Sequence, residues 1–118
     1  MAEEKKRPDT VRLQQLSKAF WESAALMSAV ELGVFSAIAT GYDQIDSAAI
    51  RLGIEPVNAE RLLTALVAMG LLELDGARFT NAPDVDRFLV EGKPTYAGPW
   101  MLFGKPRWQA WGNLTEHL

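Results

Sequence analysis

The 118-residue sequence contains no cysteine and a single histidine, His117. Without cysteine the chain can form no disulfide and can supply no thiol for catalysis or metal binding. One histidine is too few for a histidine-based metal cluster, and we interpret His117, beside Glu116, as a solvated or partner-facing residue rather than a catalytic base. The sequence therefore predicts neither a metal site nor thiol chemistry.

The sequence also lacks long apolar runs, and none reaches the roughly 18 residues of a membrane-spanning helix. Residues 1–8 (MAEEKKRP) are mostly charged, and no apolar stretch of the signal-peptide type follows them. We expect residues 1–9 to form a disordered tail. We also expect a cytoplasmic protein with no membrane partner.

Motifs that cradle nucleotides or activate a nucleophile are missing as well. The sequence has no G-x-G-x-x-G pattern and no P-loop, and its serines lack the flanking glycines of a nucleophile elbow. We therefore predict no catalytic residue and no cofactor-binding residue in this chain.

Residues 45–80 carry the pattern of a winged helix-turn-helix. A short helix capped by Asp46 or Ser47 is expected to end at Gly53, and a second is expected to run from Pro56 to Gly70. Strands over residues 71–74 and 77–80, joined by an Asp-Gly turn, complete the pattern. The predicted fold class is mainly α, a winged helix-turn-helix-like dimerisation domain with a small two-stranded β wing.

Winged helices often bind DNA, but the charge of this unit argues against that function. Three basic residues stand against five acidic ones, which gives a net charge of −2; they are Arg51, Arg61 and Arg78 against Asp46, Glu55, Glu60, Glu73 and Asp75. Phosphate contacts supply most of the affinity for DNA, and an acidic wing tip would repel them. We keep a winged-helix transcription regulator as the alternative and expect no nucleic-acid partner.

A long helix is predicted from a cap at Thr10 to Leu32, with one apolar stripe formed by Leu13, Leu16, Phe20, Met27 and Val30. From Ala24 onward apolar residues cover most of the circumference, so the helix needs cover on nearly all sides. A second subunit or the chain's own elements could provide this cover. We favour a homodimer in which the stripe forms the interface.

The chain divides into a helical winged-helix domain over residues 10–92 and linker helices over residues 93–118. The linker is rich in aromatic residues, which either pack in a core or line an apolar pocket. We predict packing roles for Trp108 and Trp111, and pocket-wall roles for Met101 and Phe103. The last stretch, from Arg107 to Leu118, is predicted to be helical.

Six short segments together resemble the N-terminal part of small-molecule O-methyltransferases such as the plant caffeate, bacterial polyketide and phenazine, and hydroxyindole enzymes. They are residues 20–26 (FWESAAL), 29–35 (AVELGVF), 61–66 (RLLTAL), 69–72 (MGLL), 80–83 (TNAP) and 111–114 (WGNL). The resemblance covers about residues 10 to 118, and its specificity comes from the order and spacing of the segments.

The resemblance implies a dimerisation domain that precedes a Rossmann-like domain. In this family the second domain holds S-adenosylmethionine and a histidine base, and the interlocked N-terminal domains help to close the pocket for a small, aromatic hydroxyl substrate. His117 does not match that base. Met101 and Leu102 fall where relatives place substrate-contacting residues, although Gly104 and Pro106 depart from the more regular helix of many relatives. A free-standing dimerisation protein remains the other alternative.

Overall fold

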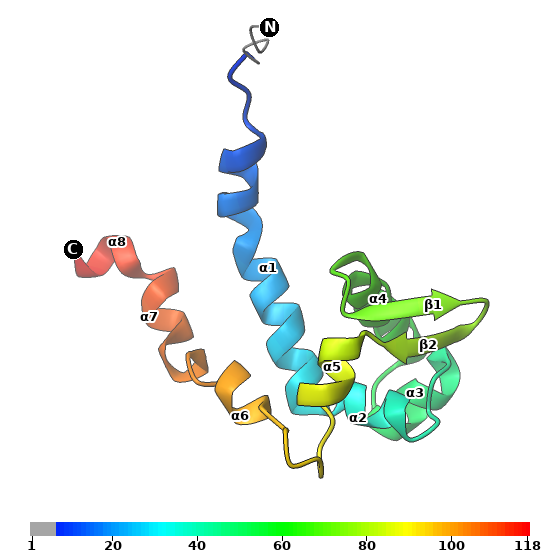
Figure 1. Cartoon of the computed structure of the whole chain (residues 1–118). Helices are drawn as coiled ribbons and strands as arrows, with labels where there is room; N and C mark the ends of the chain where they lie inside the picture. Colours follow the sequence, from blue (N-terminus) through cyan, green and yellow to red (C-terminus); the bar gives the residue numbers. More distant parts are fainter. Residues whose placement is uncertain (1–6) are drawn as a thin grey trace, which may run out of the picture.

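The computed structural model describes residues 7–118, and Figure 1 shows its elements. The helices are α1 (Val11–Leu32), α2 (Val34–Ala39), α3 (Ile45–Leu52), α4 (Pro56–Ala68), α5 (Pro83–Phe88), α6 (Gly98–Met101), η1 (Lys105–Arg107), α7 (Trp108–Gly112) and α8 (Leu114–His117). Strands β1 (Leu72–Asp75) and β2 (Arg78–Asn81) form the wing. These elements confirm the predicted fold class. Of the expected disordered tail, residues 1–6 lie outside the described part, and residues 7–9 belong to no helix or strand.

The core lies where α2, α3, α4 and the wing meet the C-terminal half of α1. Its largest fully buried side chains are Phe35, Leu63, Leu66, Leu72 and Val34. Leucines three residues apart in α4 face the same side of that helix, as helical periodicity predicts. Burial of this apolar face is the main force that holds the winged unit together.

Gly33 separates α1 from α2. Its φ of +78° is left-handed, a conformation that glycine adopts without a steric penalty, and its N–H donates to the carbonyl oxygens of Ala29 and Val30. The predicted end of the long helix at Leu32 is therefore confirmed. The turn directs Val34 and Phe35 into the core.

The cap predicted for α3 is wrong by a few residues. The helix begins at Ile45 after Gln44, and Asp46 and Ser47 lie inside its first turn. Ser47 contributes as the return partner of a capping box, because its Oγ accepts a hydrogen bond from the Gln44 N–H at 3.2 Å. The hydroxyl thus satisfies a backbone donor ahead of the helix rather than one within it.

The wing strands begin one residue later than predicted. The Leu71 N–H donates to the Leu66 carbonyl at 2.9 Å and closes the end of α4, while the Leu71 carbonyl accepts from the Ala82 N–H at 3.0 Å, just before the first residue pair of the ladder. The register pairs Leu72 with Asn81 and Asp75 with Arg78 around the predicted Asp-Gly turn. The Asn81 side-chain amide donates to the Phe35 carbonyl at 2.9 Å and ties the end of the wing to α2.

The C-terminal segment is more broken than predicted. The continuous helix expected from Arg107 to Leu118 is wrong, because α7 ends at Gly112 and Asn113 separates it from α8. Glycine and asparagine are weak helix formers, which accounts for the break. In Figure 1 this segment runs beside α1, whose N-terminal half projects away from the winged unit. Among residues 7–118 there is no helix with the length and apolar character needed to span a membrane.

Candidate functional site

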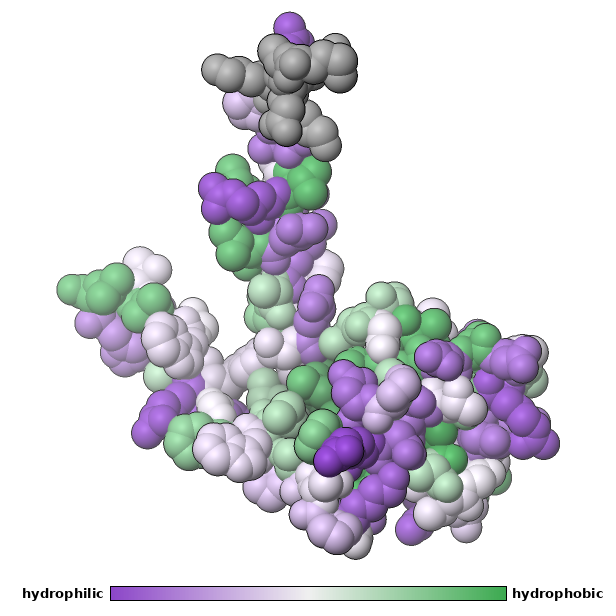
Figure 2. Space-filling view, viewed as in Figure 1, coloured by the Kyte–Doolittle hydropathy of each residue, from purple (hydrophilic) through white to green (hydrophobic). Residues whose placement is uncertain are grey.

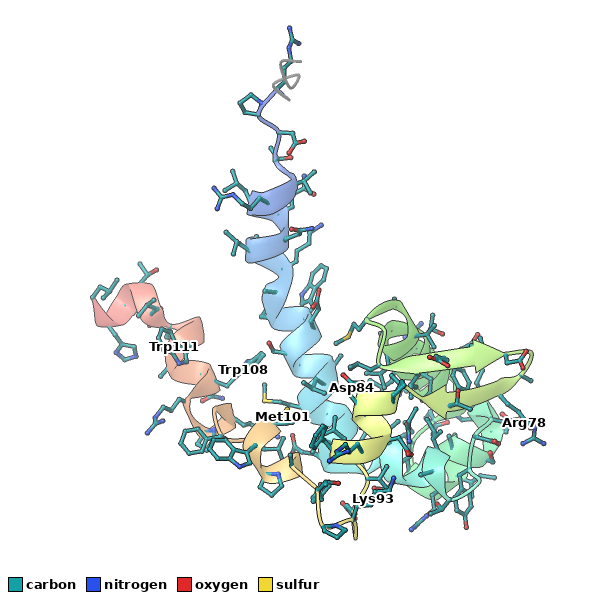
Figure 3. The ribbon with its side chains drawn as sticks, in the orientation of Figure 1. Arg78, Asp84, Lys93, Met101, Trp108 and Trp111 are labelled. Carbon is teal, nitrogen blue, oxygen red and sulfur yellow. The ribbon has the colours of Figure 1, made fainter. Side chains whose placement is uncertain are left out.

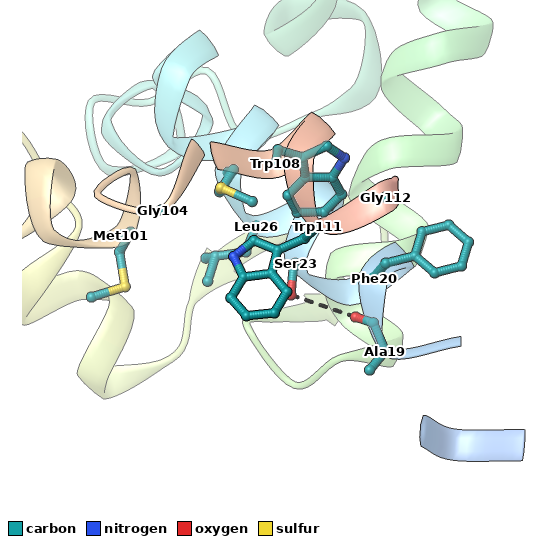
Figure 4. A pocket seen from close by; sticks show the side chains of 10 residues that line it. Ala19, Phe20, Ser23, Leu26, Met101, Gly104, Trp108, Trp111 and Gly112 are labelled. Carbon is teal, nitrogen blue, oxygen red and sulfur yellow. Dashed lines mark hydrogen bonds between the residues drawn. The ribbon is translucent and has the colours of Figure 1, made fainter. Parts of the chain in front are cut away.

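An apolar groove lies between α1 and the C-terminal segment and encloses about 770 Å³. Figure 4 shows its lining residues, which come from both sides. The α1 side supplies Ala19, Phe20, Ser23, Leu26 and Met27, and the C-terminal side supplies Met101, Gly104, Trp108, Trp111 and Gly112. We call this cavity the α1–α7 groove.

The chemistry of the α1–α7 groove is that of a binding surface. Aromatic rings and methionine side chains dominate it, and both groups adapt well to apolar partners. Ser23 contributes a hydroxyl, which bonds back to the Ala19 carbonyl in the same helix at 3.5 Å. No side chain that could serve as a general base lines the groove.

The three predicted pocket residues, Met101, Leu102 and Phe103, lie in different surroundings in the structure. Met101 lines the α1–α7 groove, and Figure 3 shows it with Trp108 between the C-terminal helices and α1. Leu102 packs against the core of the winged unit. Phe103 is 70% exposed and lies beside Trp100, with 6.3 Å between the ring centroids, and it does not line the groove. Contact of any of these three residues with substrate stays a prediction.

Trp108 and Trp111, for which packing roles were predicted, both line the groove. Trp108 is half-buried, whereas Trp111 is largely exposed. Their ring faces therefore offer apolar surface to an incoming group. Sequence periodicity missed this role because the two rings meet α1 only through tertiary structure.

The predicted interface stripe also divides into two parts. Leu13, Leu16 and Phe20 are exposed on the projecting half of α1, and Figure 2 shows apolar side chains there among polar ones. Met27 is half-buried in the groove, and Val30 is only 5% exposed because it packs in the core of its own chain. Val30 therefore offers a partner almost no surface, and the dimer-interface role of the other four residues stays a prediction.

The predicted stripe does not include Trp21, which is exposed next to Phe20. The two rings pack edge-to-face, with their centroids 5.6 Å apart. A large aromatic side chain directly beside Phe20 of the predicted stripe is the signal that could have identified it. Together the two rings form a broad apolar face on α1.

Backbone geometry positions the C-terminal wall of the groove. Tyr96 folds over Gly98 at the start of α6, where the Cβ of any other residue would collide with the Tyr96 ring. Burial, with a smaller contribution from Glu91, raises the pKa of the Tyr96 hydroxyl. The Met101 N–H donates to the Ala97 carbonyl at 3.3 Å, and the Ala97 N–H donates to the Phe88 carbonyl at 2.7 Å, so backbone hydrogen bonds join this turn to α5.

The surface of the winged unit does not resemble a DNA reader. Arg78 at the wing tip forms an ion pair with Asp43 at 2.8 Å, and the Arg51 guanidinium lies 5.6 Å from the centre of the Tyr42 ring. Two of the three arginines that could contact phosphate thus already have partners within the chain. Among the described residues there is also no cluster of three potential metal-ligating side chains.

Comparison with known proteins places this fold in a family. Residues 14–91 match the model of the O-methyltransferase dimerisation domain. The chain is 40% identical to the N,N-dimethyltransferase OxyT of Streptomyces rimosus, with 90% of this chain and 31% of OxyT covered. It is 41% identical to the tetracenomycin polyketide synthesis 8-O-methyl transferase TcmO of Streptomyces glaucescens, with 88% of this chain and 31% of TcmO covered.

Among solved structures, an O-methyltransferase family protein from Burkholderia thailandensis matches with a TM-score of 0.81 and 32% identity, over 94% of this chain and 33% of that one. This chain belongs to the O-methyltransferase dimerisation domain family. It spans about a third of the length of the relatives that it matches.

Proposed function

We propose that this chain forms a homodimer through the exposed face of α1 and the α1–α7 groove. The observation that carries the proposal is that apolar side chains of α1 stand in solvent next to an apolar groove. Monomers rarely leave so much contiguous apolar surface uncovered. A two-fold partner offers the same helix and groove in return, and closed dimers of this kind are the commonest oligomers.

We further propose that the chain is the dimerisation and pocket-closing part of an S-adenosylmethionine-dependent O-methyltransferase. The support is the family match together with TcmO, whose name describes O-methylation in polyketide synthesis. The substrate is then a small, aromatic hydroxyl compound. In this proposal S-adenosylmethionine is bound by a domain outside this chain, and the cytoplasmic location stays a prediction.

The dimer is tested by Phe20→Asp, measured by light scattering on the 118-residue chain at tens of micromolar. Phe20 is 53% exposed in the single chain and is the large aromatic on the proposed interface. A carboxylate buried without a partner costs roughly 3 kcal/mol or more, which corresponds to about a hundredfold weaker dimer. We expect the wild type to be dimeric and the variant to be largely monomeric.

The matched control is Ile50→Asp, because Ile50 is an 83% exposed apolar residue on α3, away from the groove. This control should stay dimeric. A monomeric wild type, or a Phe20→Asp variant that stays fully dimeric, would show that α1 is not the interface.

A further inference from the structure

The last sixteen residues, 103–118, form an extended arm with few contacts to the rest of the chain. All of them except Trp108 are exposed, and the residue before them, Leu102, is the last that packs against the core. Helix α7 faces α1 across the groove, and α8 lies farther from α1 in the view of Figure 1. The arm is also one wall of the α1–α7 groove, so its position decides how wide the groove is.

One ion pair joins the base of this arm to α1. The Lys105 ammonium in η1 contacts the Glu31 carboxylate in the last turn of α1, across 74 residues of sequence. Both side chains are about half exposed. The pair borders a second cavity, which shares Met27 and Trp108 with the groove, so the ion pair lies next to the groove.

The chain next to this ion pair can accommodate a change of direction. Gly104 precedes Lys105 and has open space around it, and the short 3₁₀ turn of η1 separates it from α7. An exposed ion pair is a weak interaction that salt screens easily. A contact of this kind can therefore open and close without unfolding the elements that it joins.

We propose that the Glu31–Lys105 ion pair is a latch that holds the C-terminal arm against α1 and so sets the width of the α1–α7 groove. The latch goes beyond dimerisation and methyl transfer, because it is a property of the single chain. With the pair formed, Trp108 and Trp111 stay opposite Phe20 and Ser23. With the pair broken, the arm turns at Gly104 and the groove widens.

The test is a distance measurement between two spin labels, which the absence of native cysteine makes straightforward. One label is placed at Ile50→Cys on α3 and the other at Thr115→Cys on α8, both exposed positions. Labelled chains are diluted with unlabelled chains so that only distances within one chain are recorded. We expect one narrow distribution for the otherwise unmodified chain.

Charge reversal then breaks the latch. Lys105→Glu and Glu31→Lys should each raise the fraction of open arms about two- to fivefold, the range that an exposed ion pair supports. The double reversal Glu31→Lys with Lys105→Glu restores opposite charges and should restore the narrow distribution. Raising the salt to about 1 M should broaden the distribution of the unmodified chain as the single reversals do.

The matched control is Arg78→Glu, which breaks the ion pair between Arg78 on the wing and Asp43. This change should leave the distance between the two spin labels unchanged. An unchanged distribution in both single reversals would overturn the proposal. A double reversal that stays open would also overturn it, because the position of the arm would then not depend on the attraction between the two charges.

Discussion

Leu63 in α4 is completely buried and belongs to the core of the winged unit. Leu63→Ala removes apolar surface and leaves a cavity, so we expect the free energy of unfolding to fall by about 2 to 5 kcal/mol. Ile50→Ala is the control, since Ile50 is mostly exposed and its loss should cost little. Urea unfolding followed by circular dichroism, at one fixed protein concentration, measures both. A loss below about 1 kcal/mol for Leu63→Ala would place α4 outside the core.

Two neighbouring residues of the C-terminal segment show which features of the groove the sequence could predict. Met101 was predicted to line a pocket and lies in the α1–α7 groove, whereas Phe103, two positions later, is exposed and does not line it. The two residues have similar apolar character, so composition could not separate them. The short α6 helix and the turn after it decide which of the two faces α1.

At the scale of elements, the wing and α4 allow a prediction about DNA. The winged unit carries a net charge of −2, so duplex binding would release few counterions. We expect no binding of mixed-sequence duplex at physiological salt in a fluorescence anisotropy assay. Salt-dependent binding tighter than the usual non-specific range of roughly 10⁻⁴ to 10⁻⁶ M would contradict this expectation.

A charge-reversed variant provides the control for that assay. Glu60→Lys together with Asp75→Lys changes the net charge of the unit from −2 to +2 on the same backbone. If the winged geometry is otherwise suited to a duplex, this variant should gain salt-dependent binding. The comparison separates the effect of charge from that of fold.

The elements themselves were largely predictable. Glycine at the ends of helices, proline at the start of α4 and the Asp-Gly turn of the wing are local signals, and the structure places an element boundary at each. The errors are small shifts at α3 and at the strands, together with the break at Asn113. Each of these errors arises from a backbone hydrogen bond or a weak helix former, and local propensity is too coarse to locate an element boundary to the residue.

At the scale of the whole molecule, we predict that the 118-residue chain does not bind S-adenosylmethionine. The sequence lacks a glycine-rich nucleotide loop, and the groove offers no charged group to an adenosyl or methionyl moiety. Isothermal titration calorimetry should show no heat of binding. The same preparation is checked for folding by circular dichroism, and a stoichiometric isotherm in the micromolar range would refute the prediction.

The sequence by itself determined the helical periodicity, the positions of the turns, the acidic balance of the winged unit and the family to which the chain belongs. These properties follow from neighbouring residues or from their order along the chain. Only the tertiary structure decided that Val30 is buried while Leu16 of the same stripe is exposed, and that Lys105 meets Glu31. The physical reason is that burial and pairing depend on which distant elements lie alongside a residue, and α1 is covered by the winged unit over only part of its length.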